Sequence, residues 1–529
     1  MRRTSFGLLV AVTALALLAF AGAGSAGNGN GQAQSGGNEN DAGFHTSVAP
    51  MLKALAPGGS VKAIISTGDS VGGYTFESIP DGISIARVNG RGTADILVNH
   101  ETSLVPFPLP VLNTDGTLRT PGRVDFTNAM VSELRLQQHS AGVLRGDFVI
   151  PSSANYQRFC SNFIAGPAQG FDRQLFFTNE EATDFVNRTG VAWPGGPGAE
   201  QAGVVVALDP KSGEYKSIYG MGRHNHENSV AVPGYGHPVV LSGDDTFSAP
   251  ASQLYLYSAS SADAVWNDTG TLYGFKSDDP ATNDYGDLSL LESVSGTFIP
   301  VPPAIAKGDQ TALENWSNAN GVFQFIRIED IAYDRNTPNV VYFADTGEPR
   351  AISNGNADPL LQKLIRGIAG THGPYPNGRI FKLVLDPANP LRVTSLSILI
   401  DSDAAGYNKA GTVLHQPDNV ETTANSLFVT EDPGSHNQGV AYAALWRYDL
   451  KTSSFTRAAE VDQSAQPSLP IGSWESSGIV DASSIFGPGT YLIDVQAHGW
   501  ELQEAPSAIP NVISKREAGQ LLLLELPGT

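Results

Sequence analysis

The chain has 529 residues, a formal net charge of −21 at pH 7 and a single cysteine. The excess of acidic residues argues against binding to nucleic acid, because the phosphate backbone requires Lys and Arg. A single cysteine excludes an intrachain disulfide as a support for the fold. The acidity itself has two interpretations: it keeps the protein in solution, or it supplies carboxylates that bind cations.

The N-terminal residues are typical of an export signal. Arg2-Arg3 precedes an apolar run that ends in small residues near Ala26. We therefore expect a signal peptide over residues 1–26, of the Sec or twin-arginine kind, and a periplasmic or extracellular protein. Residues 27–43 are rich in Gly and Asn, as in a flexible linker. Beyond this linker no apolar stretch is long enough to span a bilayer, and we expect a monomer.

A short hydrophobic run that ends in acidic residues recurs six times along the rest of the chain. Such runs, rich in β-branched and aromatic residues, are typical of buried strands. Their acidic ends are Glu101, Glu180-Glu181, Asp244-Asp245, Asp345, Glu431-Asp432 and Asp494. Each run follows an earlier polar group at about the distance of a β-hairpin, and these groups contain Asp81, Cys160, Glu227, Glu329, Asp418 and Glu475.

The repeated unit predicts an all-β fold: a six-bladed β-propeller with loop and short helical insertions, forming one domain over residues 44–529. The spacing of the units is too irregular for a solenoid. A pair of packed sheets is the alternative architecture, but it would scatter the acidic ends. In a propeller, the first strand of each blade lines the central channel, so the polar ends of all six units would face one another.

Four further segments complete the predicted fold. Short helices are expected from near Ala304 to Asn315, in an insertion after the third blade, and around Asp358 to Ile368, in an insertion before an outer strand of the fourth blade at Arg379 to Asp386. The C-terminal strand from Gln520 to Leu526 is expected to close the ring. Residues 44–72 are expected to be a mixed lead-in to the first blade.

Converging carboxylates predict a metal site at the channel mouth. Packed into one small volume, they would repel one another and have raised pKa values unless cations lay between them. Carboxylate oxygens suit Ca²⁺, which accepts several oxygen ligands in adaptable geometry. The ligands expected for several calcium ions are Glu101, Glu180, Glu181, Asp244, Glu227 and Glu329.

Three other residue types add chemistry to this site. Cys160 stands where other units have Asp or Glu, and a thiolate favours a transition metal such as iron; the alternative is a buried apolar side chain. Arg327 lies two residues before Glu329 and on the same face of the expected strand. We expect both to take part in catalysis, with Arg327 binding an anionic substrate, although a solvated arginine fits the sequence nearly as well. His226 and His498 are candidate acid–base groups, metal ligands or structural histidines.

These residues resemble those of the PhoX-type alkaline phosphatases, exported bacterial six-bladed propellers. The resemblance rests on short motifs, namely Asn99-His100-Glu101, Cys160 with Glu180-Glu181, Gly222-Arg223-His224-Asn225-His226-Glu227, Arg327-Ile328-Glu329-Asp330-Ile331 and Pro417-Asp418-Asn419. It implies hydrolysis of a small phosphate monoester at a mixed centre of Fe³⁺ and Ca²⁺. The iron ligands that it implies, some shared with calcium, are Cys160, Glu227, Glu329 and Asp418.

Two other functions remain open from the sequence. The Pro-Asp-Gly and Pro-Asp-Asn groups also resemble those of calcium-dependent lactonase and phosphotriesterase propellers, which lack the cysteine. The second alternative is a non-catalytic propeller that calcium stabilises and that binds a partner through its insertions.

Overall fold

The structure is a computed structural model, and it describes residues 42–106, 122–193, 195–246, 252–349, 373–409, 411–433 and 441–529. The expected signal peptide, nearly all of the expected linker and the helix expected around Asp358 to Ile368 lie outside the described residues. Residues Glu39–Thr529 form one compact unit, and the following description concerns that unit alone.

Each of the six repeated units forms an antiparallel sheet whose strands pair in chain order. Blade one contains β5 (Pro80–Asn89), β6 (Thr93–His100), β8 (Met130–Gln137) and β9 (Val143–Ile150). Blade two contains β10 (Phe159–Ala165), β11 (Leu175–Glu180), β14 (Val205–Leu208) and β15 (Tyr215–Ile218). Blade three contains β16 (His226–Ala231), β17 (Val239–Asp244), β18 (Leu254–Ser258) and β19 (Thr271–Ser277).

The remaining three blades repeat this pattern. Blade four contains β21 (Ile328–Tyr333), β22 (Val340–Asp345), β23 (Arg379–Asp386) and β24 (Asn389–Asp401). Blade five contains β25 (Pro417–Thr422), β26 (Ser426–Glu431), β27 (Ala444–Asp449) and β28 (Phe455–Val461). Blade six begins with β29 (Glu475–Asp481), β30 (Thr490–Pro506) and β31 (Val512–Glu525).

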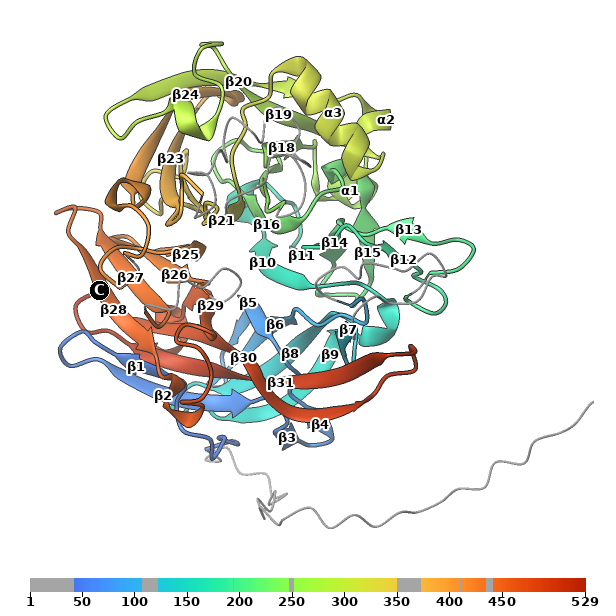
Figure 1. Cartoon of the computed structure of the whole chain (residues 1–529), viewed down its shortest axis with the longest axis vertical. Coiled ribbons are helices and arrows are strands. Elements are labelled where there is room, and N and C mark those ends of the chain that lie inside the picture. The colour runs from blue at the N-terminus through green and yellow to red at the C-terminus, as the bar shows by residue number, and fades with distance from the viewer. Residues whose placement is uncertain are drawn as a thin grey trace, which may run out of the picture. The chain divides into compact units, whose positions relative to one another are not determined.

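The first strands of the six blades contact one another in a closed cycle. β5 contacts β10, which contacts β16, and the cycle continues through β21, β25 and β29 back to β5. Figure 1 shows these inner strands with the outer strands of each blade beyond them. This arrangement confirms the predicted all-β, six-bladed propeller.

The ring is closed where the C-terminal strand, expected over Gln520 to Leu526, pairs with an N-terminal strand that the sequence did not predict. Those residues lie at the end of β31, the third strand of blade six. The fourth strand is β2 (Ser60–Ser66), and β1 (Leu52–Ala54) adds a fifth strand to blade five. Both strands lie at sheet edges and are partly exposed, so they lack the continuous hydrophobic run that marks inner strands.

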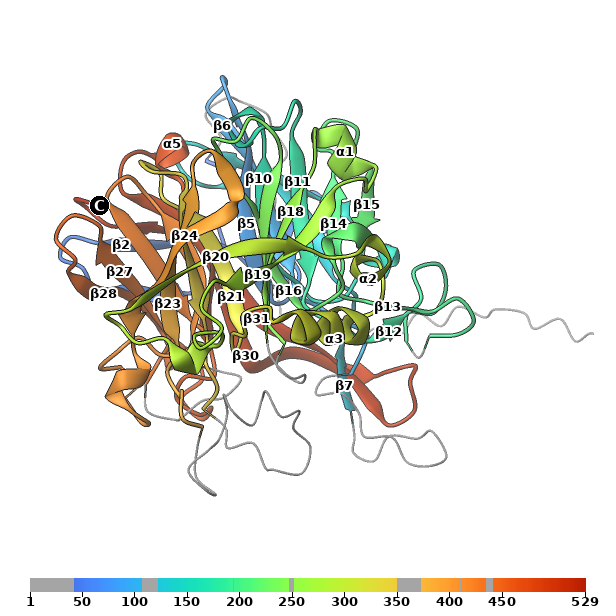
Figure 2. The ribbon, with the colours of Figure 1, turned by 90° about the horizontal axis from the view of Figure 1, so that it is seen from above.

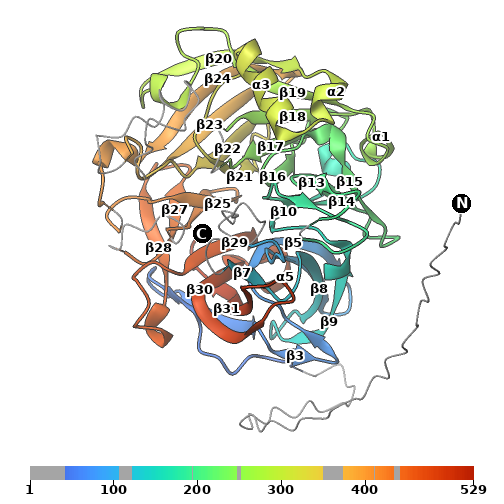
Figure 3. The ribbon, with the colours of Figure 1, turned by 45° about the vertical axis from the view of Figure 1, so that its right-hand side comes forward.

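The insertions cover the outer edges of blades three and four. β20 (Ser293–Pro300) pairs with β19 and β24, and so joins the two blades into one nine-stranded sheet. The single helix expected from Ala304 to Asn315 is two helices, α2 (Pro303–Ala306) and α3 (Gln310–Asn320). The first ends at Ala306, and Asp309 caps the second, because its carboxylate accepts a hydrogen bond from the amide of Ala312. Figure 3 shows both helices beside β18 and β19.

The other short elements lie outside the blades. They are β3 (Ser70–Val71) with β4 (Tyr74–Thr75), β12 (Phe185–Val186) with β13 (Glu200–Gln201), β7 (Gly122–Asp125), α1 (Ala262–Trp266) and α5 (Ser483–Phe486). β7 pairs in parallel with β31, whose long hairpin with β30 is seen in Figure 2. Among the described helices, none combines the length and the apolar character needed to cross a membrane.

The hydrophobic core lies between neighbouring blades. One cluster contains Phe343 and Phe381 of blade four together with Leu241 of blade three. Another joins Ile96 of blade one to Leu492 of blade six. Because the apolar faces of the sheets are used in this way, the inner ends of the first strands are left for polar residues.

Candidate metal centre

All six inner hairpins share a β-bulge at the end where the polar groups lie. The pairing of first and second strands shifts register after the first paired residue in blades one to five and after the second in blade six. A bulge of this kind re-aims a side chain and is common near functional sites. The residues at the re-aimed position are Asp81, Cys160, Glu227, Glu329, Asp418 and Ser477.

A second set of residues is fixed by a backbone hydrogen bond that five blades repeat. In each, the residue just past the second strand donates its N–H to the carbonyl just before the first strand, at 2.9–3.0 Å. The donors in blades one to five are Glu101, Glu181, Asp245, Thr346 and Asp432. The shared geometry places these side chains next to the re-aimed residues.

The two sets converge in three linked groups of candidate metal ligands. Within each group the ligand atoms all lie within 4.8 Å of one another. The groups are Asp81 with Glu101 and Cys160, Cys160 with Glu181 and Glu227, and Glu227 with Glu329 and Asp418. We call these seven residues the axis cluster. Because Cys160 and Glu227 each belong to two groups, the cluster is continuous across blades one to five.

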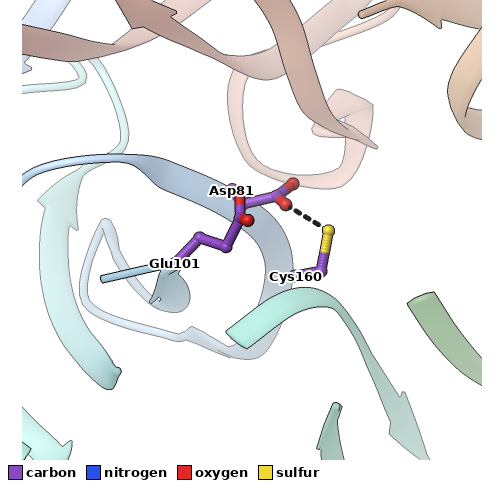
Figure 4. Close-up of side chains that lie close together, drawn as sticks. All are labelled: Asp81, Glu101 and Cys160. Carbon is purple, nitrogen blue, oxygen red and sulfur yellow. Dashed lines mark hydrogen bonds between the residues drawn. The ribbon is translucent and has the colours of Figure 1, made fainter. Parts of the chain in front are cut away.

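The cysteine forms a hydrogen bond with a carboxylate. The thiol of Cys160 donates to Oδ2 of Asp81 at 2.8 Å, and Figure 4 shows both with Glu101. Burial, followed by the charges of Asp81 and Glu227, raises the pKa of this thiol well above its usual range. A bound cation would oppose both effects and favour the thiolate.

Burial also raises the pKa of each carboxylate of the cluster and is the first cause in every case. Neighbouring carboxylates raise the pKa further for all of them except Asp81. For Glu101, burial and Asp81 raise the pKa to about 8. Oε2 of Glu227 is buried without a hydrogen-bond partner among the described residues. This donor set fits cations, since oxygen atoms and one sulfur converge without enough protein donors to satisfy them.

A different set of buried acids stabilises the backbone. Glu180, Asp345 and Glu431, which we call the anchor carboxylates, each end a second strand and accept several hydrogen bonds from backbone N–H groups. Glu180 also pairs with Arg188 at 2.6 Å. Glu431 also accepts from Nε1 of Trp446 at 2.8 Å.

Of the eight expected metal ligands, the structure brings six together. Glu101, Cys160, Glu181, Glu227, Glu329 and Asp418 belong to the axis cluster. Glu180 is an anchor carboxylate. Asp244 occupies the equivalent place in blade three, where it accepts a hydrogen bond from the hydroxyl of Thr246 and lies 3.7 Å from Nδ1 of His224. Neither of these two acids lies in the three groups.

Three acids of the same layer are absent from the expected ligand set: Asp81, Asp245 and Asp432. Asp81 is the re-aimed residue of blade one. Asp245 and Asp432 hold the same backbone position as Glu101. For Asp245 and Asp432 a usable signal was present in the sequence, because each is the second member of an acidic pair aligned with Glu101. Choosing the second member instead of the first requires the register of the strands.

Blade six departs from the pattern expected for it. The register places Ser477 at the re-aimed position, where the sequence had suggested Glu475. Its hydroxyl donates to Oδ1 of Asp81 at 2.7 Å. Gln496 then follows and donates from Nε2 to Oε2 of Glu101 at 3.2 Å. Asp494, the expected acidic end, is buried in the middle of β30 instead.

Arg327 contacts two carboxylates of this layer. Its Nε and Nη2 donate to both oxygens of Asp245, at 2.6 and 2.7 Å, and Nη2 lies 3.2 Å from Glu329. The guanidinium is therefore an internal counter-charge that orients both acids, since a planar fork suits a carboxylate.

The backbone that precedes the re-aimed residues is strained in three blades. Ile79, Arg158 and Gln416 have φ values of 49°, 43° and 49°, in the left-handed region that L-residues other than Asn and Asp seldom adopt. Each is the residue whose carbonyl accepts the repeated hydrogen bond. Such strain, held by its surroundings, is typical of functional sites.

The fold and the axis cluster define a β-propeller protein with a largely buried site of six carboxylates and one thiol at the bulged ends of its inner hairpins. Within that class the chain belongs to the family described as alkaline phosphatase PhoX, whose model matches residues 168–465. Members of this family are metal-dependent alkaline phosphatases, so the protein is a phosphoric-ester hydrolase. The match includes Glu181, Glu227, Glu329 and Asp418, and the structure adds the remaining three cluster residues from outside it.

Other comparisons show little similarity. No curated protein sequence matches the chain significantly. Among solved structures, the NanB sialidase from Streptococcus pneumoniae is 9% identical, with a TM-score of 0.38 over 88% of this chain and 70% of that one. The quinohemoprotein alcohol dehydrogenase from Comamonas testosteroni is 11% identical, with a TM-score of 0.25 over 83% of this chain and 60% of that one.

Proposed function

We propose that the protein hydrolyses phosphate monoesters at a mixed iron and calcium centre held by the axis cluster. The observation that carries this proposal is the continuous set of seven ligand residues, with one thiol among six carboxylates. Iron would be held by Cys160, Glu227, Glu329 and Asp418, since a thiolate favours a transition metal. Calcium would be held by the oxygen ligands, which are Asp81, Glu101 and Glu181 together with carboxylates shared with iron.

The bound cations would supply positive charge that polarises the phosphoryl oxygens and activates water. The chain itself holds and orients these groups. Thr346 donates its hydroxyl to Oε1 of Glu329, and Ser161 donates to Oε1 of Glu227 at 2.9 Å. Each hydrogen bond fixes one carboxylate oxygen and so directs the other. Phosphoryl transfer depends mainly on positioning and charge, which suits a site with many ligands and no recognisable side-chain nucleophile.

Arg327 is proposed to act at the same site. In the structure its guanidinium binds Asp245 and Glu329. Once cations neutralise these acids, the same guanidinium would be available to attract the phosphoryl group of a substrate. Glu329 is proposed to take part in catalysis as a ligand that Arg327 and Thr346 orient.

The test of this function is hydrolysis by the full-length protein, produced in a host that exports it and analysed for metals. We expect turnover of p-nitrophenyl phosphate, with both iron and calcium present. Turnover of a lactone or a phosphotriester instead would favour the lactonase and phosphotriesterase alternative. If the metal-replete protein cleaves none of these substrates, the proposed function is wrong.

Export is proposed on the sequence alone. Residues 1–26 are proposed to be a signal peptide and residues 27–43 a linker, before a single propeller domain that reaches residue 529. N-terminal sequencing of the protein from a periplasmic or culture fraction tests this: a mature chain that starts near residue 27 is expected, and a chain that keeps Arg2-Arg3 in that fraction would contradict it.

A further inference from the structure

A histidine lies at the edge of the axis cluster. His498 is on β30, two residues beyond Gln496, which contacts Glu101. The pairing of β30 with β31 shifts register just after Ala497, so His498 stands at a bulge. Its side chain is 35% exposed, whereas the cluster itself is nearly all buried. Solvent therefore reaches this ring beside the buried cluster.

Two carboxylates hold this ring from opposite sides. Nδ1 lies 3.2 Å from Oε2 of Glu517, and Nε2 lies 3.5 Å from Oε2 of Glu475. Glu517 is itself fixed by Lys515 at 2.8 Å and by the amide of Gly499 at 2.9 Å. The contact with Glu517 is thus short and its carboxylate is held in place, while the contact with Glu475 is long. The Nε2–H is the proton that is free to move to another oxygen.

The charges around His498 favour its protonated form. Burial and Lys515 lower the pKa of His498, whereas Glu517 and, more weakly, Asp432 raise it. The raising effects are larger, so the pKa lies above the usual value. The charge acts on the cluster as well: burial and Asp81 raise the pKa of Glu101, whereas His498 lowers it.

The other histidines around the channel are kept neutral. Burial is the first cause of a lowered pKa in each of them, to about 4 in two cases and about 3 in a third. These residues are His100, His226 and His415, and for His224 burial lowers the pKa well below the usual value. Of the described histidines close to the cluster, His498 is the one suited to give up a proton.

We propose that His498 is the general acid that protonates the leaving group, an inference that rests on the proposed phosphatase function. As the ester P–O bond breaks, its electron pair goes to the ester oxygen, and Nε2–H of the imidazolium transfers its proton there to form the alcohol. An oxygen from water forms the new P–O bond and releases its protons to solvent. One of these protons restores the imidazolium, so that the ester and water give alcohol and phosphate.

This role predicts a dependence on the leaving group. p-Nitrophenolate departs without protonation, whereas the alkoxide of glycerol 2-phosphate requires a proton in the transition state. In metal-loaded His498→Gln, we expect kcat for glycerol 2-phosphate to fall about 100-fold and kcat for p-nitrophenyl phosphate to fall less than about tenfold. The wild-type kcat for the alkyl ester should decline as pH rises through the pKa of His498, and the variant should lack that decline.

Controls separate this role from a structural one. His139 is exposed and lies in the turn between β8 and β9 of blade one. His139→Gln should leave both activities unchanged. Glu517→Gln keeps the imidazole but removes its braced partner, and it should move the alkaline decline to lower pH. Equal losses on both esters in His498→Gln, or no loss on the alkyl ester, would overturn the general-acid role. If the wild-type enzyme cleaves neither ester, the failure lies in the proposed function itself.

Discussion

The anchor carboxylates and the axis cluster are neighbours in sequence but differ in what surrounds them. In Glu180-Glu181, the first acid accepts hydrogen bonds from the amides of Gln157 and Gly203 and pairs with Arg188. The second lies among other carboxylates beside Cys160. Both are buried. The comparison shows that burial does not identify a ligand; the supply of protein donors does.

The energetic consequence follows from that supply. A buried carboxylate with several N–H donors is partly compensated by the fold: burial raises the pKa of Glu431 to about 8, and its three N–H donors lower it. A carboxylate that faces other carboxylates lacks such donors and needs a proton or a cation. The anchor set can therefore stabilise the metal-free protein, and the axis cluster stabilises it only when cations bind. Each prediction below changes one set and leaves the other.

The largest effect is expected for Cys160→Ser. Serine keeps the size of the side chain but removes the soft ligand. We expect loss of iron and at least about a 100-fold loss of phosphatase activity. Mutation of a residue that only orients a metal ligand already costs up to about 100-fold. Circular dichroism and calcium-dependent melting should remain those of a folded propeller. Unchanged turnover with unchanged iron content would show that the thiol is only a packing residue.

The sequence predicts where the buried acids lie, but it does not show which of them are anchor carboxylates and which belong to the axis cluster. The hydrophobic runs locate all six inner hairpins, because buried strands need continuous apolar residues, and the acid marks the strand end in five of them. The choice between Asp244 and Asp245 depends on a bulge in the partner strand, which shifts the register and leaves no pattern of its own. Blade six shows the same limit, since Ser477 and Gln496 replace the acids that the sequence suggested.

The second effect is calcium-dependent stability. Ions that bind only the folded state at about 100 times their Kd add about 2.7 kcal/mol per independent site. We expect the Tm of metal-stripped protein to rise on addition of Ca²⁺, and Asp81→Asn to reduce the rise. Glu431→Gln changes an anchor carboxylate. It should lower the Tm of the metal-stripped protein but keep the full increase in Tm on addition of Ca²⁺. An equal response of wild type and Asp81→Asn would contradict a calcium role for the cluster.

The third effect is a difference in pH dependence between the metal-free and the calcium-bound protein. In the metal-free protein the pKa of Glu101 is raised to about 8 from an ordinary 4.5, through burial and Asp81. The folded state then holds a proton that the unfolded state has lost, so its stability falls as pH rises from about 4.5 to 8, by up to about 1.4 kcal/mol per unit. Calcium competes with that proton. The gain in Tm on adding Ca²⁺ should therefore widen with pH, and parallel curves with and without Ca²⁺ would contradict the assignment.

The smallest effect is expected within the anchor set itself. Oε1 and Oε2 of Glu431 accept from the amides of His415 and Ala444 at 2.8 Å, and Nε1 of Trp446 adds a third donor. In Glu431→Gln, the new NH₂ faces donors, so one buried amide loses its acceptor at a cost of about 1–3 kcal/mol. Denaturant unfolding of metal-stripped protein should show this loss, whereas kcat of the metal-loaded variant should stay within about twofold. A loss of metal content or of kcat as large as that of Cys160→Ser would mean that the anchor carboxylates belong to the metal site, and the distinction between the two sets would fail.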